Sequence, residues 1–161
     1  MLRIVDAGSS GAPDMEFGDY LPFKLQFPTD VGCPHLYWRT GDFNRRLIEL
    51  QIDRQDGRIL AISLVLPGMV VEGLPKFVLP INAIDGVPVT STQGWPENRL
   101  IDDSQDFEVF VDDEFIFVRF DTMNAISRIT SSKVSFGIEE EGGLVWILFA
   151  TSQSKKLLEF N

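Results

Sequence analysis

Carboxylates are the one type of chemically capable side chain that this sequence carries in excess. Nine acidic residues lie from Glu97 to Asp121, against two basic residues, Arg99 and Arg119. This stretch, called the acidic segment below, therefore holds an excess of seven negative charges, out of a formal net charge of −10 for the whole chain. Three interpretations are open: a solvated surface that protects strand edges from aggregation, a docking surface for a basic protein, or a carboxylate pair that hydrolyses a substrate or binds calcium.

We take the docking surface as the functional hypothesis, because charge complementarity gives fast and specific association with a basic partner. Seven carboxylates, most of them in predicted loops and turns, are assigned to this surface: Asp102, Asp103, Asp106, Glu108, Asp112, Asp113 and Glu114. Tyr37 and Trp38 are assigned to it as well, because the sequence places them in or near loops, where exposed aromatic side chains anchor protein interfaces. The alternative for Tyr37, Trp38 and Trp95 is that they cap the core at the ends of the sheet.

No metal site is predicted. Calcium loops of the EF-hand type space their ligands as DxDxDG followed by Glu, and the stretch from Asp102 to Asp106 lacks both the glycine and the final glutamate. Cys33 and His35, the single cysteine and the single histidine, lie close together in a proline-flanked loop. A structural zinc site needs four ligands, and a catalytic thiol and its base are normally distant in sequence, so this pair fits neither.

Motifs for phosphate binding and for nucleophilic catalysis are also missing from the sequence. There is no GxxxxGK[ST] loop, no GxGxxG between a strand and a helix, and no serine in a GxSxG context. We therefore expect no cofactor and no enzymatic activity. A glycosidase pair stays open, because its two carboxylates can come from anywhere in the chain, but nothing in the sequence selects two of them.

Length and composition predict one folded domain, residues 1–161. Hydrophobic residues make up 44% of the chain, with 13 Phe and 3 Trp, which is ample for a packed core. The pI near 4.5 disfavours nucleic acids and anionic membrane surfaces as partners. A single cysteine, no apolar run of signal-peptide length and no stretch long enough to span a membrane predict a cytoplasmic protein. The oligomeric state stays undetermined.

The candidate functional residues must be positioned by β-strands, and the sequence predicts three β-hairpins. In each of them, hydrophobic residues alternate with other residues along the arms. They are predicted over residues 48–66 around Gly57, residues 107–120 around Asp113, and residues 133–150 around Gly142. With several shorter strands, they predict more than about 35% strand. The predicted fold class is mainly β: an antiparallel sheet built of hairpins, arranged as a half-barrel or a two-layer sandwich, with at most one or two short helices.

The remaining segments predict less regular structure. Residues 7–15 are expected to form a flexible lead-in, and the alternating residues 21–27 a half-buried strand. Prolines scattered over residues 67–96 predict edge strands, crossings or an extended loop there. Residues 121–132 are expected to form at most a short helix, and the tail from residue 152 a final strand or a turn of helix.

The stretch Leu47–Val65, LIELQIDRQDGRILAISLV, is similar in cadence to hairpins of the immunity proteins of bacterial polymorphic-toxin and contact-dependent inhibition systems. The acidic, β-rich character of the rest of the chain resembles this family too. The resemblance implies tight, stoichiometric binding to a cognate toxin, often a basic nuclease whose active cleft is blocked by acidic groups.

The predicted function is therefore a protein-binding inhibitory module of the immunity type, which neutralises a basic toxin by blocking its active site. One alternative is a β protein that binds a small ligand or carbohydrate on a concave sheet face lined by Phe and Trp. Another is a structural subunit that assembles through a free sheet edge. A toxin gene immediately upstream would favour the first function, and a carbohydrate operon the second.

Overall fold

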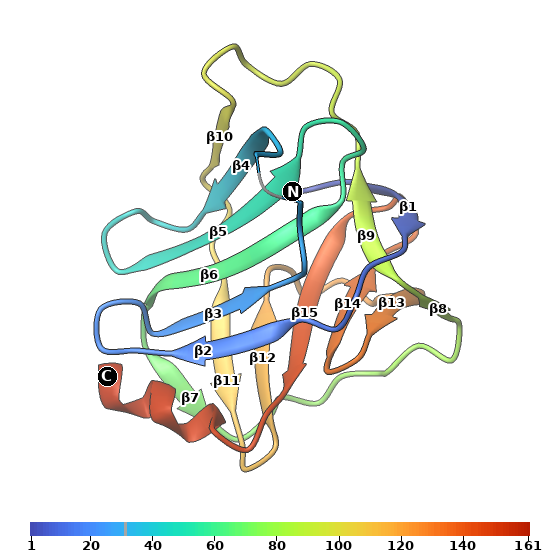
Figure 1. Cartoon of the computed structure of the whole chain (residues 1–161). Helices are drawn as coiled ribbons and strands as arrows, with labels where there is room; N and C mark the ends of the chain where they lie inside the picture. Colours follow the sequence, from blue (N-terminus) through green and yellow to red (C-terminus); the bar gives the residue numbers. More distant parts are fainter. Residues whose placement is uncertain (31) are drawn as a thin grey trace.

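The computed structural model describes residues 1–30 and 32–161 (Figure 1). Strands account for 49% of the chain and helix for 4%, so the predicted mainly β class and strand content are confirmed. Two large sheets lie face to face as a sandwich, and a small two-stranded sheet lies at one side (Figure 1). Within the described residues neither large sheet closes into a barrel, and the arrangement fits a sandwich, one of the two predicted architectures.

The first large sheet has six strands in the order β10-β4-β5-β6-β3-β2. Its neighbours pair antiparallel except β10 and β4, which run parallel at one edge. The strands are β2 (Asp14–Phe17), β3 (Phe23–Gln26), β4 (His35–Thr40), β5 (Arg46–Asp53), β6 (Ile59–Pro67) and β10 (Leu100–Asp103).

The second large sheet has seven strands in the order β7-β11-β12-β15-β14-β13-β8, and its edge strands β7 and β8 pair parallel with their neighbours. Its strands are β7 (Val70–Glu72), β8 (Ala83–Asp85), β11 (Glu108–Val111), β12 (Phe115–Arg119), β13 (Ser127–Ser131), β14 (Val134–Ile138) and β15 (Leu144–Ala150). The small sheet pairs β1 (Ile4–Gly8) antiparallel with β9 (Val87–Thr90). The chain ends in a 3-10 helix, η1 (Ser154–Phe160).

All three predicted hairpins are present, as β5–β6, β11–β12 and β14–β15. The first turns at Gly57, whose φ is 78°. A Cβ at this position would lie 2.0 Å from the carbonyl oxygen of Thr90, at the end of β9. Glycine is therefore required there both by the backbone conformation and by the packing of β9 against the turn.

Several other segments differ from the prediction. Residues 7–15, expected as a flexible lead-in, begin in β1 and end in β2, so only residues 9–13 lie outside strands. Residues 121–132, expected as at most a short helix, instead hold β13, because pairing with β14 and β8 overrides a weak local helical pattern. The proline-rich stretch, residues 67–96, forms edge strands, which was one of the outcomes predicted for it. The tail from residue 152 forms a turn of helix, which was also one of its two predicted outcomes.

The core lies between the two large sheets and is built from the inward faces of both. In β5 the alternate residues Ile48, Leu50 and Ile52 are fully buried, while the residues between them stay partly exposed. Phe23 of β3 and Phe149 of β15 meet edge to face across the layers, with 4.8 Å between ring centroids. The hydrophobic residues that recur at every second position in the sequence are therefore the ones that pack between the two sheets.

A smaller apolar cluster covers the outer face of the second sheet. Phe77, from the irregular segment between β7 and β8, stacks on Phe117 of β12 with 4.5 Å between ring centroids, and it also contacts Trp146 of β15. A Cβ at Gly137 of β14 would lie 2.1 Å from the Trp146 indole, so glycine makes room for this ring. The chain itself thereby covers the most aromatic part of this sheet face.

Candidate functional site

The acidic segment begins in the β9–β10 loop, forms β10 and β11, and continues through the β11–β12 turn into β12. The prediction that Asp102 and Asp103 lie in a loop is wrong, because both belong to β10, which pairs parallel with β4. Asp112 and Asp113 do lie in the β11–β12 turn, as predicted. The segment therefore runs along an edge of the first sheet before it enters the second.

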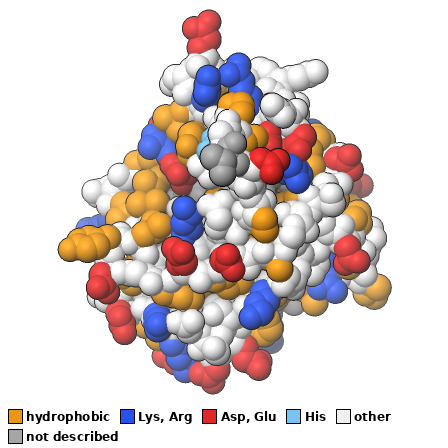
Figure 2. All heavy atoms as spheres, in the orientation of Figure 1, with side chains coloured by type: hydrophobic (Ala, Val, Ile, Leu, Met, Phe, Trp, Pro, Cys, Tyr) orange, Lys and Arg blue, Asp and Glu red, His pale blue; other side chains and the backbone are white. Residues whose placement is uncertain are grey.

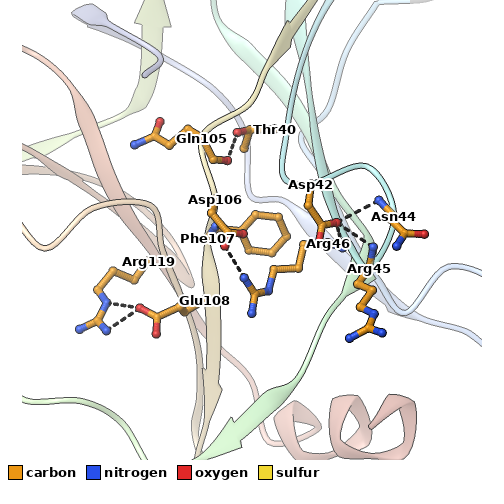
Figure 3. Close-up of polar contacts among 10 residues, drawn as sticks. All are labelled: Thr40, Asp42, Asn44, Arg45, Arg46, Gln105, Asp106, Phe107, Glu108 and Arg119. Atoms are coloured by element: carbon orange, nitrogen blue, oxygen red, sulfur yellow. Dashed lines mark hydrogen bonds and ion pairs between the residues drawn. The ribbon is translucent and has the colours of Figure 1, made fainter.

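Five carboxylates of the acidic segment form ion pairs within the chain. The pairs are Asp102 with Arg39 at 2.7 Å, Asp103 with the Met1 ammonium at 2.6 Å, Asp106 with Arg46, Glu108 with Arg119 at 2.5 Å, and Asp113 with Lys155 at 2.8 Å. Figure 3 shows two of them, Asp106–Arg46 and Glu108–Arg119. Four of the five cations come from outside the segment, so its excess of negative charge falls from seven to three.

These ion pairs order the surface more than they stabilise the fold. Four of the five acidic side chains are between 47% and 86% exposed, and a surface pair contributes only about 0–1 kcal/mol to stability. Hydrogen bonds from the Arg39 guanidinium nevertheless lower the pKa of Asp102, and the same contact raises the pKa of Arg39. Both groups therefore stay charged over the whole physiological range.

The two remaining assigned carboxylates lie in the β11–β12 turn and behave differently from each other. Asp112 accepts hydrogen bonds from the backbone N–H groups of Glu114 and Phe115, at 2.9 and 2.8 Å, and so closes the turn. The side chain of Glu114 is exposed and makes no ion pair or hydrogen bond with any described residue. Of the seven assigned carboxylates, Glu114 is therefore the only one whose side chain has no ion-pair or hydrogen-bond partner within the described part of the chain.

The prediction that Tyr37 and Trp38 lie in or near loops is wrong, because both belong to β4. Trp38 points into the core, is 3% exposed, and lies edge to face with Phe120 at 5.9 Å between ring centroids. Tyr37 lies on the opposite, outer face of the sheet, where its hydroxyl accepts a hydrogen bond from Gln51 Nε2 at 3.2 Å. A partner can therefore contact Tyr37 but not Trp38.

The Cys33 and His35 pair is not arranged for catalysis. The Cys33 thiol donates a hydrogen bond to the buried carboxylate of Asp53 at 2.9 Å, and this contact raises the thiol pKa to about 11. A thiol that stays protonated is a poor nucleophile. His35 lies edge to face with Tyr37, at 6.4 Å between ring centroids. Among the described residues, no group of three or more potential metal ligands occurs.

A groove of about 740 Å³, which the sequence analysis did not predict, opens where three connections meet. The β2–β3 loop supplies Tyr20 and Pro22, the β4–β5 loop supplies Arg45, and the β6–β7 connection supplies Met69. The C-terminal end of η1 adds Phe160. Figure 1 shows these loops and the C-terminus together at the left of the molecule.

Large apolar side chains around the groove are exposed to solvent. Tyr20 is 100% exposed and Met69 is 74% exposed. Phe43, at the tip of the β4–β5 loop, and Phe160 are partly exposed as well. Figure 2 shows hydrophobic side chains gathered and projecting at the left edge of the molecule, over these loops. The sequence signal is weak: Tyr20 and Met69 are apolar residues near Gly and Pro, in segments that the sequence does not bring together.

The β4–β5 loop connects the groove to the acidic segment. One carboxylate oxygen of Asp42 accepts hydrogen bonds from the backbone N–H groups of Asn44, Arg45 and Arg46, at 2.9, 2.7 and 2.8 Å (Figure 3). These bonds lower the pKa of Asp42 to about 2, so the loop is held by a permanently charged acceptor. Arg46 lines the groove and also binds Asp106, so the groove and the acidic segment adjoin.

Comparison with protein-family models gives no match, and comparison with curated proteins gives none either. No helix in the described part of the chain has both the length and the apolar character needed to cross a membrane. The fold and the site together define a β-sandwich with an open, apolar-rimmed groove beside a partly neutralised acidic surface.

Proposed function

We propose that this chain is a protein-binding inhibitory module of the immunity type, which neutralises a basic toxin by covering its active site. The observation that carries the proposal is the set of exposed apolar side chains at the groove, above all Tyr20 and Met69. Tyrosine and methionine are enriched at protein interfaces, where a few well-packed side chains carry most of the binding energy. Exposed apolar patches of this kind commonly mark interaction sites.

Tyr20 is the expected anchor of the interface. Because its side chain is fully exposed, its ring gains nothing from packing within its own chain. Burial of a large apolar side chain in a partner's pocket yields roughly 1.5–3 kcal/mol. Leu66 and Pro67, at the end of β6, also line the groove and offer apolar surface to a side chain of the partner.

Charge supports a basic partner. The net charge of −10 attracts a basic protein over long distances, which raises the association rate. Asp19 is exposed in the groove lining, and Glu114 is exposed in the β11–β12 turn; neither forms an ion pair with a described residue, so both carboxylates are free to contact a basic partner. The proposal therefore combines an apolar contact at the groove with attraction by the surrounding charge.

We place this function in the cytoplasm. Cys33 is the only cysteine, so it cannot form an internal disulfide, and its raised pKa keeps the thiol protonated at neutral pH. A reducing compartment is the usual location of such a chain. The proposed partner is a protein, and neither a cofactor nor a nucleic acid is required.

The proposal is tested by titrating the purified chain with each protein encoded beside its gene and measuring dissociation constants by calorimetry. We expect one basic protein to bind at 1:1 stoichiometry. The Tyr20→Ala/Met69→Ala double variant should weaken this binding by at least about 2 kcal/mol, or roughly 30-fold. The matched double variant Val78→Ala/Ile81→Ala changes two residues that are also exposed but lie outside the groove lining, and it should bind like the wild type. Equal losses in both variants would contradict the proposed docking site.

A small-ligand-binding protein is the second candidate, because the groove volume falls within the range of about 300–1,000 Å³ typical of ligand pockets. Under this alternative, the isolated chain should bind a small apolar fluorophore saturably, and Met69→Ala should abolish that binding. The same chain should then bind none of the neighbouring gene products.

A further inference from the structure

We propose that a second cleft, beneath the β9–β10 loop, binds a small anion that carries a carboxylate or phosphate group. The cleft has a volume of about 290 Å³ and is lined by Leu36, Arg54, Trp95, Glu97 and Arg99, among others. Figure 1 shows this loop projecting at the top of the molecule, between β9 and β10 and away from the loops of the groove. The inference goes beyond the proposed function and does not depend on it.

Two arginines give the cleft its chemistry. Arg54, in the β5–β6 turn, and Arg99, just before β10, are both exposed. Neither guanidinium forms an ion pair or a hydrogen bond with any described residue, although the chain as a whole has an excess of carboxylates. A guanidinium presents its N–H donors as a planar fork that matches the oxygens of a carboxylate or phosphate. Two such groups on one cleft are therefore suited to an oxyanion.

The backbone holds Arg99 in an uncommon conformation. Its φ is 62°, in the left-handed region that residues other than glycine rarely adopt. Its N–H donates to the carbonyl oxygen of Pro96, and its carbonyl oxygen accepts from the N–H of Tyr37, both at 2.9 Å. A strained residue fixed by its surroundings in this way is found disproportionately at ligand sites.

Trp95 supplies a fixed apolar wall. Its indole Nε1 donates a hydrogen bond to the carbonyl oxygen of Ser91 at 3.0 Å, and its ring packs against the edge of the core. Leu36 of β4 lines the cleft as well. A flat or apolar body of the ligand can therefore pack on Trp95 while its oxygens meet the arginines. Glu97 adds one negative charge to the cleft, so the net charge of the cleft is +1. Its carboxylate competes with the ligand for the two arginines.

The test uses NMR titrations of the full chain with inorganic phosphate and, separately, with benzoate, at constant ionic strength. We expect saturable shifts of the Trp95 indole N–H and of the Arg54 and Arg99 Nε–H signals with at least one probe. Saturation by phosphate alone indicates a phosphate-bearing ligand, and saturation by benzoate alone indicates a carboxylate on a planar body.

Charge variants make the test specific. Arg54→Gln and Arg99→Asn, in which asparagine tolerates the positive φ, should each weaken binding about tenfold or more, because each removes a charge-assisted hydrogen bond. Glu97→Gln should instead tighten binding. Lys133→Gln, an exposed lysine in the β13–β14 turn with no ion pair among the described residues, should leave it unchanged.

Two results would overturn the assignment. One is the absence of a saturable shift with either probe. The other is a loss of affinity in Lys133→Gln as large as that in Arg54→Gln, which would mean that only the overall charge of the chain matters. A gain of affinity in Glu97→Gln cannot arise from misfolding, so it keeps the test decisive if an arginine variant is unstable. Neither failure would affect the groove, because none of these residues lines it.

Discussion

At the scale of single residues, several carboxylates in this protein accept backbone hydrogen bonds that hold loops and turns. Asp42 accepts three backbone hydrogen bonds in the β4–β5 loop, Asp112 accepts two in the β11–β12 turn, and Glu139 accepts two in the β14–β15 turn. Asp102 and Asp106 bind arginines instead. Acidic residues that stand out in the sequence as a possible binding surface therefore have structural roles first.

The depressed pKa of Asp42 predicts a specific pH dependence of stability. Because its folded-state pKa is about 2, below the ordinary value of 3.8, the carboxylate stabilises the folded state fully above the ordinary value. That contribution decreases as the pH falls and is lost below about 2. Urea unfolding of the wild type and of Asp42→Asn should therefore show a stability difference that shrinks as the pH is lowered through this range. A difference that stays constant with pH would show that the Asp42 charge does not hold the loop.

The residues of the acidic segment were visible in the sequence, but their partners were not. Asp106 and Arg46 are 60 positions apart, and no local pattern links them. Tyr37 and Trp38 were misplaced because they follow a short stretch with Pro34, which favours a loop, whereas their strand is defined by pairing with β5. The groove residues Tyr20 and Met69 meet only after β2, β3, β6 and η1 have packed.

At the scale of elements, the three hairpins were predictable from the sequence, whereas β10 and β13 were not. A hairpin brings neighbouring residues together, so its alternation and its turn residues are both local signals, as at Gly57. β10 instead depends on a partner far away in the sequence, because it pairs parallel with β4. β13 pairs with the neighbouring β14, but also parallel with the distant β8. Short strands of this kind carry too few residues for a periodic pattern to be distinguished from a loop.

The Arg39–Asp102 pair tests how firmly β10 is attached to β4. A double-mutant cycle with Arg39→Ala and Asp102→Ala, measured by urea unfolding, should give a coupling energy of about 0.2–1 kcal/mol, because Asp102 is 47% exposed and solvent screens the pair. Glu114→Ala, which removes a carboxylate without a partner among the described residues, should leave stability within about 0.5 kcal/mol of the wild type. A coupling of several kcal/mol would mean that the ion pair, rather than backbone pairing, holds β10 in place.

At the scale of the whole molecule, the sandwich carries two distinct surfaces that we propose as binding sites. Loops at one end form the apolar-rimmed groove, and the β9–β10 loop forms the arginine-lined cleft elsewhere (Figure 1). The net charge of −10 acts over both surfaces: it attracts a basic partner to the groove and opposes an anion at the cleft. Added salt should therefore slow association of the protein partner with the groove.

Amide hydrogen exchange of the chain, free and in complex with the basic protein identified by calorimetry, tests whether the groove is the docking site. If the groove is the docking site, exchange should slow on binding in the three groove connections, residues 18–22, 41–46 and 67–69, with smaller changes in the β11–β12 turn around Glu114. Backbone amides in β13 and β8, at the far edge of the second sheet, should exchange as in the free chain. Protection confined to the outer face of the first sheet around Tyr37, or to the edge at β8, with the groove amides unchanged, would show that the partner docks elsewhere.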